Sequence, residues 1–399
     1  MIYFDHSATT PLDPHVLKAM QPYFLKKFGN SSSLHSYGQE AARAVDKFRA
    51  KIAKTLNCEP DEIIFTSGST EANNLAIKGL IMALKEQGVI KPHIITSMIE
   101  HSAIIEPCRE LVKSKQAEVT YLKVKSNGVI DINELKKSIK DNTVLVTIMY
   151  ANSEVGSMQP IKEIGKFIKD VNKGRVEQGK LLPIYFHSDA TQAVNFATCD
   201  TKHLNLDMMS LSGHKIYGPK GVGALYAKNN IHISALQRGG HHERNLRSGT
   251  LNVPGIVGLG AAVVLAQKDM EKNNKKIVKL RDYLVDKVKK NIPDVVLNTD
   301  RKVSLPSHAH FSFLGVEGEA ILIALDLKAG IAVSTGSACA SSTLDASHVL
   351  LAMGIKKEIA HNAIRFTLGK NNTKKEIDTL IKALKTIVKR YREMAPELG

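Results

Sequence analysis

The chain has 399 residues, 43% of them hydrophobic and 24% charged, which is the composition of an ordered globular protein and excludes disordered or collagen-like classes. It is longer than a single hydrophobic core usually supports, so two domains are expected. No apolar run approaches the roughly 18–20 residues of a membrane span, and the first residues lack the charged and apolar regions of a secretory signal, so we expect a cytoplasmic protein without membrane contact.

The charge is strongly basic, with 55 Lys and Arg against 39 Asp and Glu and a formal net charge of +16. Such an excess raises the question of nucleic acid binding. The lysines, however, are interleaved with apolar residues at helical spacing, as in 272–290 and 374–392, and the chain has no Trp for base stacking. We therefore interpret them as solvated helix faces and expect no direct nucleic-acid binding.

The four cysteines do not form a CxxC pair, and no zinc-ligand spacing is present, so neither a disulfide framework nor a metal site is expected. They are Cys58, Cys108, Cys199 and Cys339.

Short apolar runs alternate with helical patterns from about residue 40 to 230, which is typical of βα units and a mostly parallel sheet. One amphipathic helix is predicted over 41–56 and another over 71–84. Seven strands are predicted, at 62–66, 93–97, 119–122, 144–149, 184–187, 207–210 and 223–226.

The pattern changes after about residue 258. Long basic amphipathic helices are predicted over 258–290 and 373–392, flanking short strands at 309–313 and 364–367. The fold class is therefore α/β, with a large domain over 15–258, a smaller α+β domain over 259–399, and an N-terminal segment, 1–14, that joins them.

Three polar motifs follow predicted strands. Ser67-Gly68-Ser69-Thr70 opens a helix, where free N–H groups can bind a phosphate, although Ser and Thr at such positions are often only helix caps. Asp189 stands at a strand end, where it could hold a proton on a ring nitrogen or cap the next helix. Lys215, in Ser212-Gly213-His214-Lys215, could bind a carbonyl cofactor covalently or be an ordinary solvated charge.

The order of these motifs favours the functional interpretation of each. A phosphate loop, then an aspartate, then a lysine is the order found in fold-type I enzymes, and each part meets a need of their cofactor, pyridoxal 5′-phosphate (PLP). The sequence closely resembles the NifS/IscS-type (group I) cysteine desulfurases, members of the class V aminotransferase-like enzymes, over essentially the whole chain. The matching segments are Tyr3–Pro11, Phe28–Asn30, Ser69–Ala76, Glu100–His101, Asp189–Gln192, Ser212–Lys215, Arg247–Thr250, Ser334–Cys339 and Arg365–Gly369.

The resemblance implies a role for each matching residue. Lys215 would bind PLP covalently and move protons, Asp189 would pair with its ring nitrogen, and His101 would stack on the ring and act as an acid or base. Arg365 would bind the substrate carboxylate through a planar guanidinium. The remaining cofactor contacts would come from Ser69, Thr70, Asn152, Gln192, Ser212 and His214, with Thr250 reaching the phosphate of a partner subunit in a homodimer, and Asn152 and Asn30 would also contact the substrate.

Cys339 lies in a run of small polar residues without apolar periodicity, which is typical of a loop and not of a core element. The resemblance implies that its thiolate attacks the sulfur of L-cysteine, so that a persulfide forms on Cys339 and alanine is released. The persulfide sulfur would pass to an acceptor such as an iron–sulfur scaffold or a tRNA-thiolation enzyme. The other three cysteines are interpreted as small buried hydrophobic residues.

Two alternatives remain open. A selenocysteine lyase or another class V aminotransferase-like enzyme would share the fold, although an aminotransferase has no use for a loop thiol. A non-enzymatic nucleic-acid-binding or scaffold protein would have no need of Lys215, Asp189, His101 and Cys339. Two positions depart from the family pattern, because Ser31 replaces a proline and Ser153 replaces an asparagine.

Overall fold

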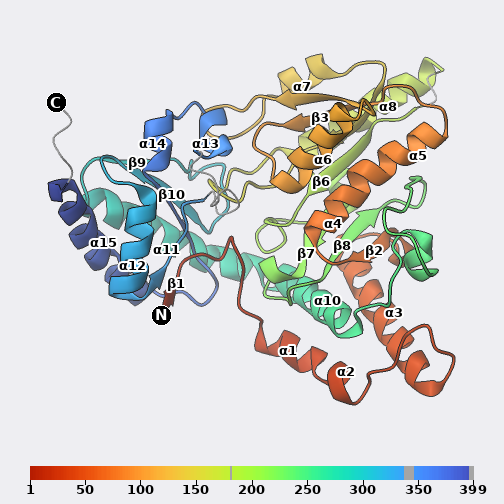
Figure 1. The fold of residues 1–399 in the computed structure, drawn as a ribbon, viewed down its shortest axis with the longest axis horizontal. Helices are drawn as coiled ribbons and strands as arrows, with labels where there is room; N and C mark the ends of the chain where they lie inside the picture. The colour runs from red at the N-terminus through yellow and green to blue at the C-terminus, as the bar shows by residue number, and fades with distance from the viewer. Residues whose placement is uncertain (180–181, 337–345, 395–399) are drawn as a thin grey trace.

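A computed structural model describes residues 1–179, 182–336 and 346–394. Its main sheet has seven strands in the order β2-β8-β7-β6-β5-β3-β4 (Figure 1). Only β8 runs antiparallel to its neighbours, which confirms the predicted mostly parallel sheet. The strands are β2 (Ile63–Thr66), β3 (His93–Ser97), β4 (Glu118–Leu122), β5 (Thr143–Thr147), β6 (Tyr185–Asp189), β7 (Met208–Ser212) and β8 (Gly223–Ala227).

Helices cover both faces of this sheet, because successive strand residues point to opposite sides. Ile63 and Phe65 pack into one apolar cluster with α3, α8 and α10, whereas Ile64 packs into another with α4, α5 and α6. These helices are α3 (Ser36–Leu56), α4 (Ser69–Asn74), α5 (Leu80–Glu86), α6 (Ser102–Lys113), α8 (Ile161–Glu177) and α10 (Val253–Lys268), and one π turn, Leu75–Gly79, joins α4 to α5.

The C-terminal part forms a smaller antiparallel sheet in the order β12-β10-β9, covered by helices on the left of Figure 1. Phe4 lies in this second core, and β1 (Ile2–Tyr3) pairs with β11, so the N-terminal segment crosses from one core to the other. The elements are β9 (Val295–Leu297), β10 (His308–Phe313), β11 (Ile331–Ala332), β12 (Ala363–Thr367), α11 (Met270–Asn291), α12 (Gly318–Ala329) and α15 (Lys374–Met394).

The single helix predicted over 258–290 is wrong: α10 and α11 are separate helices that meet at an angle of 69° around Asp269. The core residues of α10 belong to the first apolar cluster and those of α11 to the second. The chain therefore passes from the first apolar core to the second at Asp269. The domain boundary at 258/259 stays a prediction. In the parts that the structure describes, no single helix is both long and apolar enough to span a membrane. Only α10 and α11 taken together, across the bend between them, reach that length and composition.

The remaining elements are short and lie mostly at the edges of the two cores. They are α1 (Pro14–Met20), α2 (Pro22–Leu25), α7 (Ile132–Ser138), α9 (Thr201–Leu204), α13 (His348–Ala352) and α14 (Lys357–His361).

Candidate active site

The carboxyl ends of the parallel strands converge on one cavity of about 690 Å³, the position at which open α/β sheets bind ligands. The segments that follow β2, β3, β5, β6 and β7 each contribute a polar side chain to its wall. Most of the residues singled out from the sequence line it: Ser69, Thr70, His101, Asn152, Asp189, Gln192, His214, Lys215 and Arg365.

Lys215 lies in the turn after β7. Its ammonium donates to the carbonyl oxygen of Ser7 at 2.5 Å and to that of Ala8 at 2.6 Å. The N-terminal segment thus forms one wall of the cavity beside the lysine. These two carbonyl groups could not be found from the sequence, because backbone groups carry no residue-type signal.

Asp189 ends β6 and is 7% exposed. One carboxylate oxygen accepts a hydrogen bond from the Asn73 side chain at 2.7 Å and the other from the backbone N–H of Thr191 at 3.0 Å. Both bonds come from N–H donors, and they hold the carboxylate in place as a partner for a protonated ring nitrogen. Asn73 was not predicted; its signal in the sequence is a polar residue among the apolar positions of the α4–α5 run.

His101 follows β3 and caps α6, because its Nδ1 accepts from the N–H of Ala103 at 3.1 Å. Burial lowers the pKa of the imidazole, so the ring is neutral at pH 7 and can accept a proton. Burial shifts the pKa of the preceding residue, Glu100, upward to about 8. The Glu100 carboxyl group accepts from the Ser97 hydroxyl and from the backbone N–H of Met149.

The predicted phosphate loop begins α4, which Gly68 precedes and Ser69 opens. Ser212, at the end of β7, lies beside it: its hydroxyl is 4.0 Å from the position that a Cβ on Gly68 would take. His214 bonds the Thr9 hydroxyl at 3.2 Å through Nδ1, and burial lowers its pKa to about 4. The helix N-terminus, two hydroxyls and a neutral imidazole form an anion-binding surface.

Asn152 and Gln192 line the cavity, but the structure already uses part of their bonding capacity. The side-chain oxygen of Asn152 accepts from the N–H groups of Glu154 and Val155, and its amide nitrogen donates to the carbonyl of Ile99 at 3.1 Å. The Gln192 amide nitrogen donates at 3.0 Å to the carbonyl of Ser7, the same group that accepts from Lys215.

Arg365 projects from β12 and is 3% exposed. One terminal nitrogen donates to Asp5 at 2.7 Å and the other to the carbonyl of Ser153 at 2.9 Å. Its buried Nε lacks a hydrogen-bond partner within the described ranges. Since a guanidinium has five N–H groups, donors remain for a carboxylate in the cavity.

Cys339 lies outside the described residues. The last residue before this gap, Gly336, and the first one after it, Ala346, both line the cavity. Of the other cysteines, Cys108 and Cys199 are buried as predicted and Cys58 is only partly so. Burial raises the pKa of all three thiols to about 12, so they are protonated at neutral pH.

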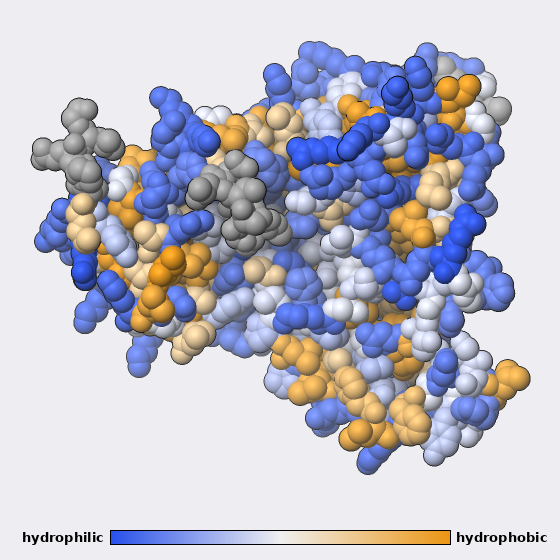
Figure 2. All heavy atoms as spheres, viewed as in Figure 1, coloured by the Kyte–Doolittle hydropathy of each residue, from blue (hydrophilic) through white to orange (hydrophobic). Residues whose placement is uncertain are grey.

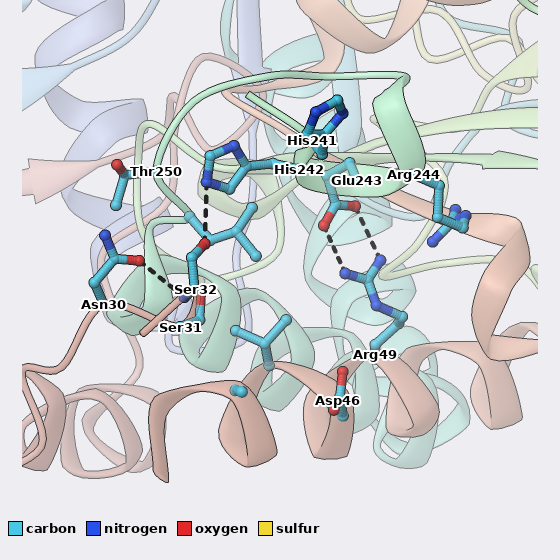
Figure 3. A pocket seen from close by; sticks show the side chains of 13 residues that line it. Asn30, Ser31, Ser32, Asp46, Arg49, His241, His242, Glu243, Arg244 and Thr250 are labelled. Atoms are coloured by element: carbon cyan, nitrogen blue, oxygen red, sulfur yellow. Dashed lines mark hydrogen bonds and ion pairs between the residues drawn. The ribbon is translucent and has the colours of Figure 1, made fainter. Parts of the chain in front are cut away.

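Ser212 is not among the residues that line this cavity, and neither are two further predicted residues, Asn30 and Thr250. Asn30 and Thr250 line a second cavity, of about 650 Å³, together with α3 and the loop that precedes Thr250 (Figure 3). Asn30 comes from the segment after α2, and its side chain accepts from the N–H of Ser32. Within one chain, the structure therefore separates these two residues from the other nine.

The first cavity fits PLP on the chemistry of its donors. It holds a lysine for the aldehyde, an aspartate for the ring nitrogen and a helix N-terminus for the phosphate. The buried hydroxyl of Thr191 and the Nε of Arg365 also lack partners among the residues described, as expected of groups that meet a ligand. The fold and this site define a fold-type I PLP-dependent enzyme.

Comparison with known proteins narrows this class. Residues 2–380 match the family described as aminotransferase class-V. The chain is 46% identical to the cysteine desulfurase IscS of Dictyoglomus turgidum, over 99% of this chain and 96% of that protein. A solved NifS-like protein is 36% identical with a TM-score of 0.89, covering 98% of this chain and 99% of that one. A NifS-like protein from Rickettsia africae is 33% identical with a TM-score of 0.83, covering 98% of this chain and 99% of that one.

The chain belongs to the class-V aminotransferase family and, within it, to the IscS- and NifS-type cysteine desulfurases. The resemblance stated from the sequence motifs is thereby confirmed, as are the fold class and PLP as the cofactor.

Proposed function

We propose that the chain is a cysteine desulfurase that converts L-cysteine to L-alanine and holds the sulfur as a persulfide on Cys339. One observation carries the proposal. Lys215, Asp189 and Arg365 face a single cavity, and both described ends of the segment that contains Cys339 lie in its wall.

The side chains divide the work by their chemistry. Arg365 binds the substrate carboxylate, and Asp189 keeps a proton on the cofactor ring, where PLP, when bound, acts as an electron sink for the substrate Cα. Lys215 Nζ takes the proton from Cα, and His101, neutral because it is buried, takes one from the substrate amine or thiol.

The sulfur step is balanced without an external oxidant. The Cys339 thiolate attacks the substrate sulfur, an S–S bond forms and the Cβ–S bond breaks. The electron pair of that bond and two protons complete the methyl group and Cα of alanine. We assign the reactive thiol to Cys339, since Cys58, Cys108 and Cys199 do not line the cavity and burial raises the pKa of each.

Incubation of the purified protein with L-cysteine tests this function. Alanine should form in amounts equal to the sum of sulfide and protein-bound persulfide, and Lys215→Ala should abolish both products. Pyruvate in place of alanine would point to an elimination reaction, and an oxo acid would point to transamination, and either product would contradict the proposal.

The sulfur acceptor is proposed only by class: a protein that takes a persulfide sulfur, such as an iron–sulfur scaffold or a tRNA-thiolation enzyme. We place the reaction in the cytoplasm. Neither point changes the chemistry at Cys339.

We also propose a homodimer in which Thr250 reaches the cofactor phosphate of the partner subunit. Two observations support it. Thr250 and Asn30 line a separate cavity, and exposed apolar side chains gather over α1, α2 and the segment after them (Figure 2). These side chains are Leu17, Phe24, Leu25, Phe28, Leu34 and, at the start of α3, Tyr37.

Light scattering should give twice the mass of the chain. Phe24→Ser and Leu25→Ser, two changes on this exposed surface, should together weaken dimerisation and PLP retention. A fully active monomer that retains PLP would contradict the dimer and the role of Thr250.

A further inference from the structure

The loop that leads to Thr250 contains three consecutive residues in the left-handed region. Glu243, Arg244 and Asn245 have φ values of 44°, 56° and 64°. Residues other than glycine adopt this conformation rarely, and a run of three persists only where the surroundings hold it. Strained segments of this kind are concentrated at functional sites.

A buried ion pair holds this turn (Figure 3). The side chain of Glu243 is 1% exposed. Its carboxylate accepts from the two terminal nitrogens of Arg49 on α3 at 2.6 and 2.9 Å. It also accepts from the backbone N–H of Phe65 at 2.8 Å, and Arg49 donates to the carbonyl of Ile63 at 2.6 Å. Both backbone groups belong to β2, which lies at one edge of the main sheet.

A second ion pair ties the same loop to the predicted phosphate site. Arg247 Nε donates to Glu71 at 2.8 Å, and the other carboxylate oxygen of Glu71 accepts from the N–H of Ser67 at 2.7 Å. Glu71 lies in the first turn of α4. The loop between Glu243 and Thr250 is thus fixed at one end to the sheet edge and near the other to the helix that begins at Ser69.

Stability alone is a weak explanation for the buried pair. Desolvating a carboxylate and a guanidinium offsets most of their attraction, so a buried pair is at best weak evidence of stabilisation. A bidentate pair does, however, fix one geometry.

We propose that Arg49 and Glu243 are positioning residues that hold the left-handed turn and thereby aim Thr250 at the phosphate of PLP. The inference rests on the proposed role of Thr250 in the homodimer. It assigns to the buried pair an effect on cofactor affinity, although neither residue lines the cavity that holds Lys215 and Asp189.

Titration of the apo-protein with PLP and with pyridoxal, which lacks the phosphate, tests this. Glu243→Gln keeps the shape of the side chain and removes its charge, and should weaken PLP binding about tenfold while leaving pyridoxal binding unchanged. Asp207→Asn is the matched control, since Asp207 also accepts from a strand N–H, that of Phe186, and pairs with Lys228. It should lower the melting temperature without changing either affinity.

A double-mutant cycle with Thr250→Ala separates positioning from general destabilisation. If Glu243 acts through Thr250, Glu243→Gln should weaken PLP binding less than twofold in the Thr250→Ala background. A multiplicative loss in the double variant, or an unchanged PLP affinity in Glu243→Gln, would overturn the inference. An unchanged PLP affinity in Thr250→Ala would instead overturn the proposed role of Thr250, and the inference with it.

If Glu243→Gln does not fold, Arg49→Lys provides the same test, because a lysine keeps the charge but cannot bond both carboxylate oxygens. Selective loss of PLP affinity relative to pyridoxal supports positioning. An equal loss for both compounds contradicts it.

Discussion

Arg365 is held in the cavity by two bonds that leave part of its guanidinium available. Arg365→Lys should raise KM for cysteine about tenfold or more, since an ammonium cannot replace a planar fork that binds a carboxylate through two N–H groups. PLP retention should not change, because Arg365 serves the substrate. Steady-state kinetics with cysteine, together with the absorbance of bound PLP, measure the two effects.

Arg175→Lys is the matched control for this substitution. Arg175 is also buried, but it donates to backbone carbonyls, those of Thr143, Leu182 and Lys140, away from the cavity. Its replacement should lower stability and leave KM unchanged. Similar KM values in the two variants would show that the substrate carboxylate is bound elsewhere.

The sequence motifs predicted which side chains line the cavity, but not how each is held. Lys215 and Asp189 are recognisable because they follow strands and because their residue types suit PLP. The carbonyl groups of Ser7 and Ala8 are contributed by a distant segment that the fold brings to Lys215. No local pattern indicates such a contact, and the same is true of the strained turn at Glu243.

The strands were predicted well because buried parallel strands are short apolar runs with clear ends. The run at 93–97 matches β3 at both ends, and the other six strands lie within two residues of their predicted bounds. The bend at Asp269 was missed, because both helices continue the helical spacing and only the core against which they pack changes.

Two glycines in α8 make a test of packing at the scale of one helix. A Cβ on Gly165 would lie 2.0 Å from the carbonyl oxygen of Leu204, whereas one on Gly174 would meet nothing within 4 Å. Gly165→Ala should therefore destabilise the protein by about 1–3 kcal/mol. Gly174→Ala should stabilise it by about 0.4–1 kcal/mol, because alanine restricts the unfolded chain and favours the helix.

Urea unfolding of the two variants measures these changes. Equal effects of the two substitutions would show that α8 does not pack against Leu204 as described. Because neither glycine lines the active-site cavity, the activity of the folded protein should stay unchanged in both variants.

The whole molecule should lose stability in mild acid, because several histidines are buried in the neutral form. Burial lowers the pKa of His308 and of His310 to about 3, well below the ordinary value of 6.5. The unfolded chain therefore binds more protons than the folded one between about pH 6.5 and pH 3, so stability falls as the pH falls through this window. At pH 5 each of these two histidines should lower the free energy of unfolding by about 2 kcal/mol.

Glu100 acts in the opposite direction, because its pKa is raised from 4.5 to about 8 in the folded protein. The folded state therefore binds more protons than the unfolded chain in this range, and the stability that Glu100 contributes is lost as the pH rises through it. The histidines outnumber it, because His187 and His214 also have a lowered pKa. The urea midpoint at pH 5 should therefore lie below that at pH 7. An equal or higher midpoint at pH 5 would contradict the buried neutral state of these rings.

The central claim is that the protein extracts sulfur from cysteine onto one thiol, and intact-mass spectrometry of Cys339→Ser tests it most directly. After incubation with L-cysteine, the unaltered protein should carry one additional sulfur atom, removed by a reductant. Cys339→Ser should carry none and form no alanine, although it should still bind PLP and cysteine, because Lys215, Asp189 and Arg365 are intact. Persulfide or wild-type alanine formation in Cys339→Ser would contradict the account.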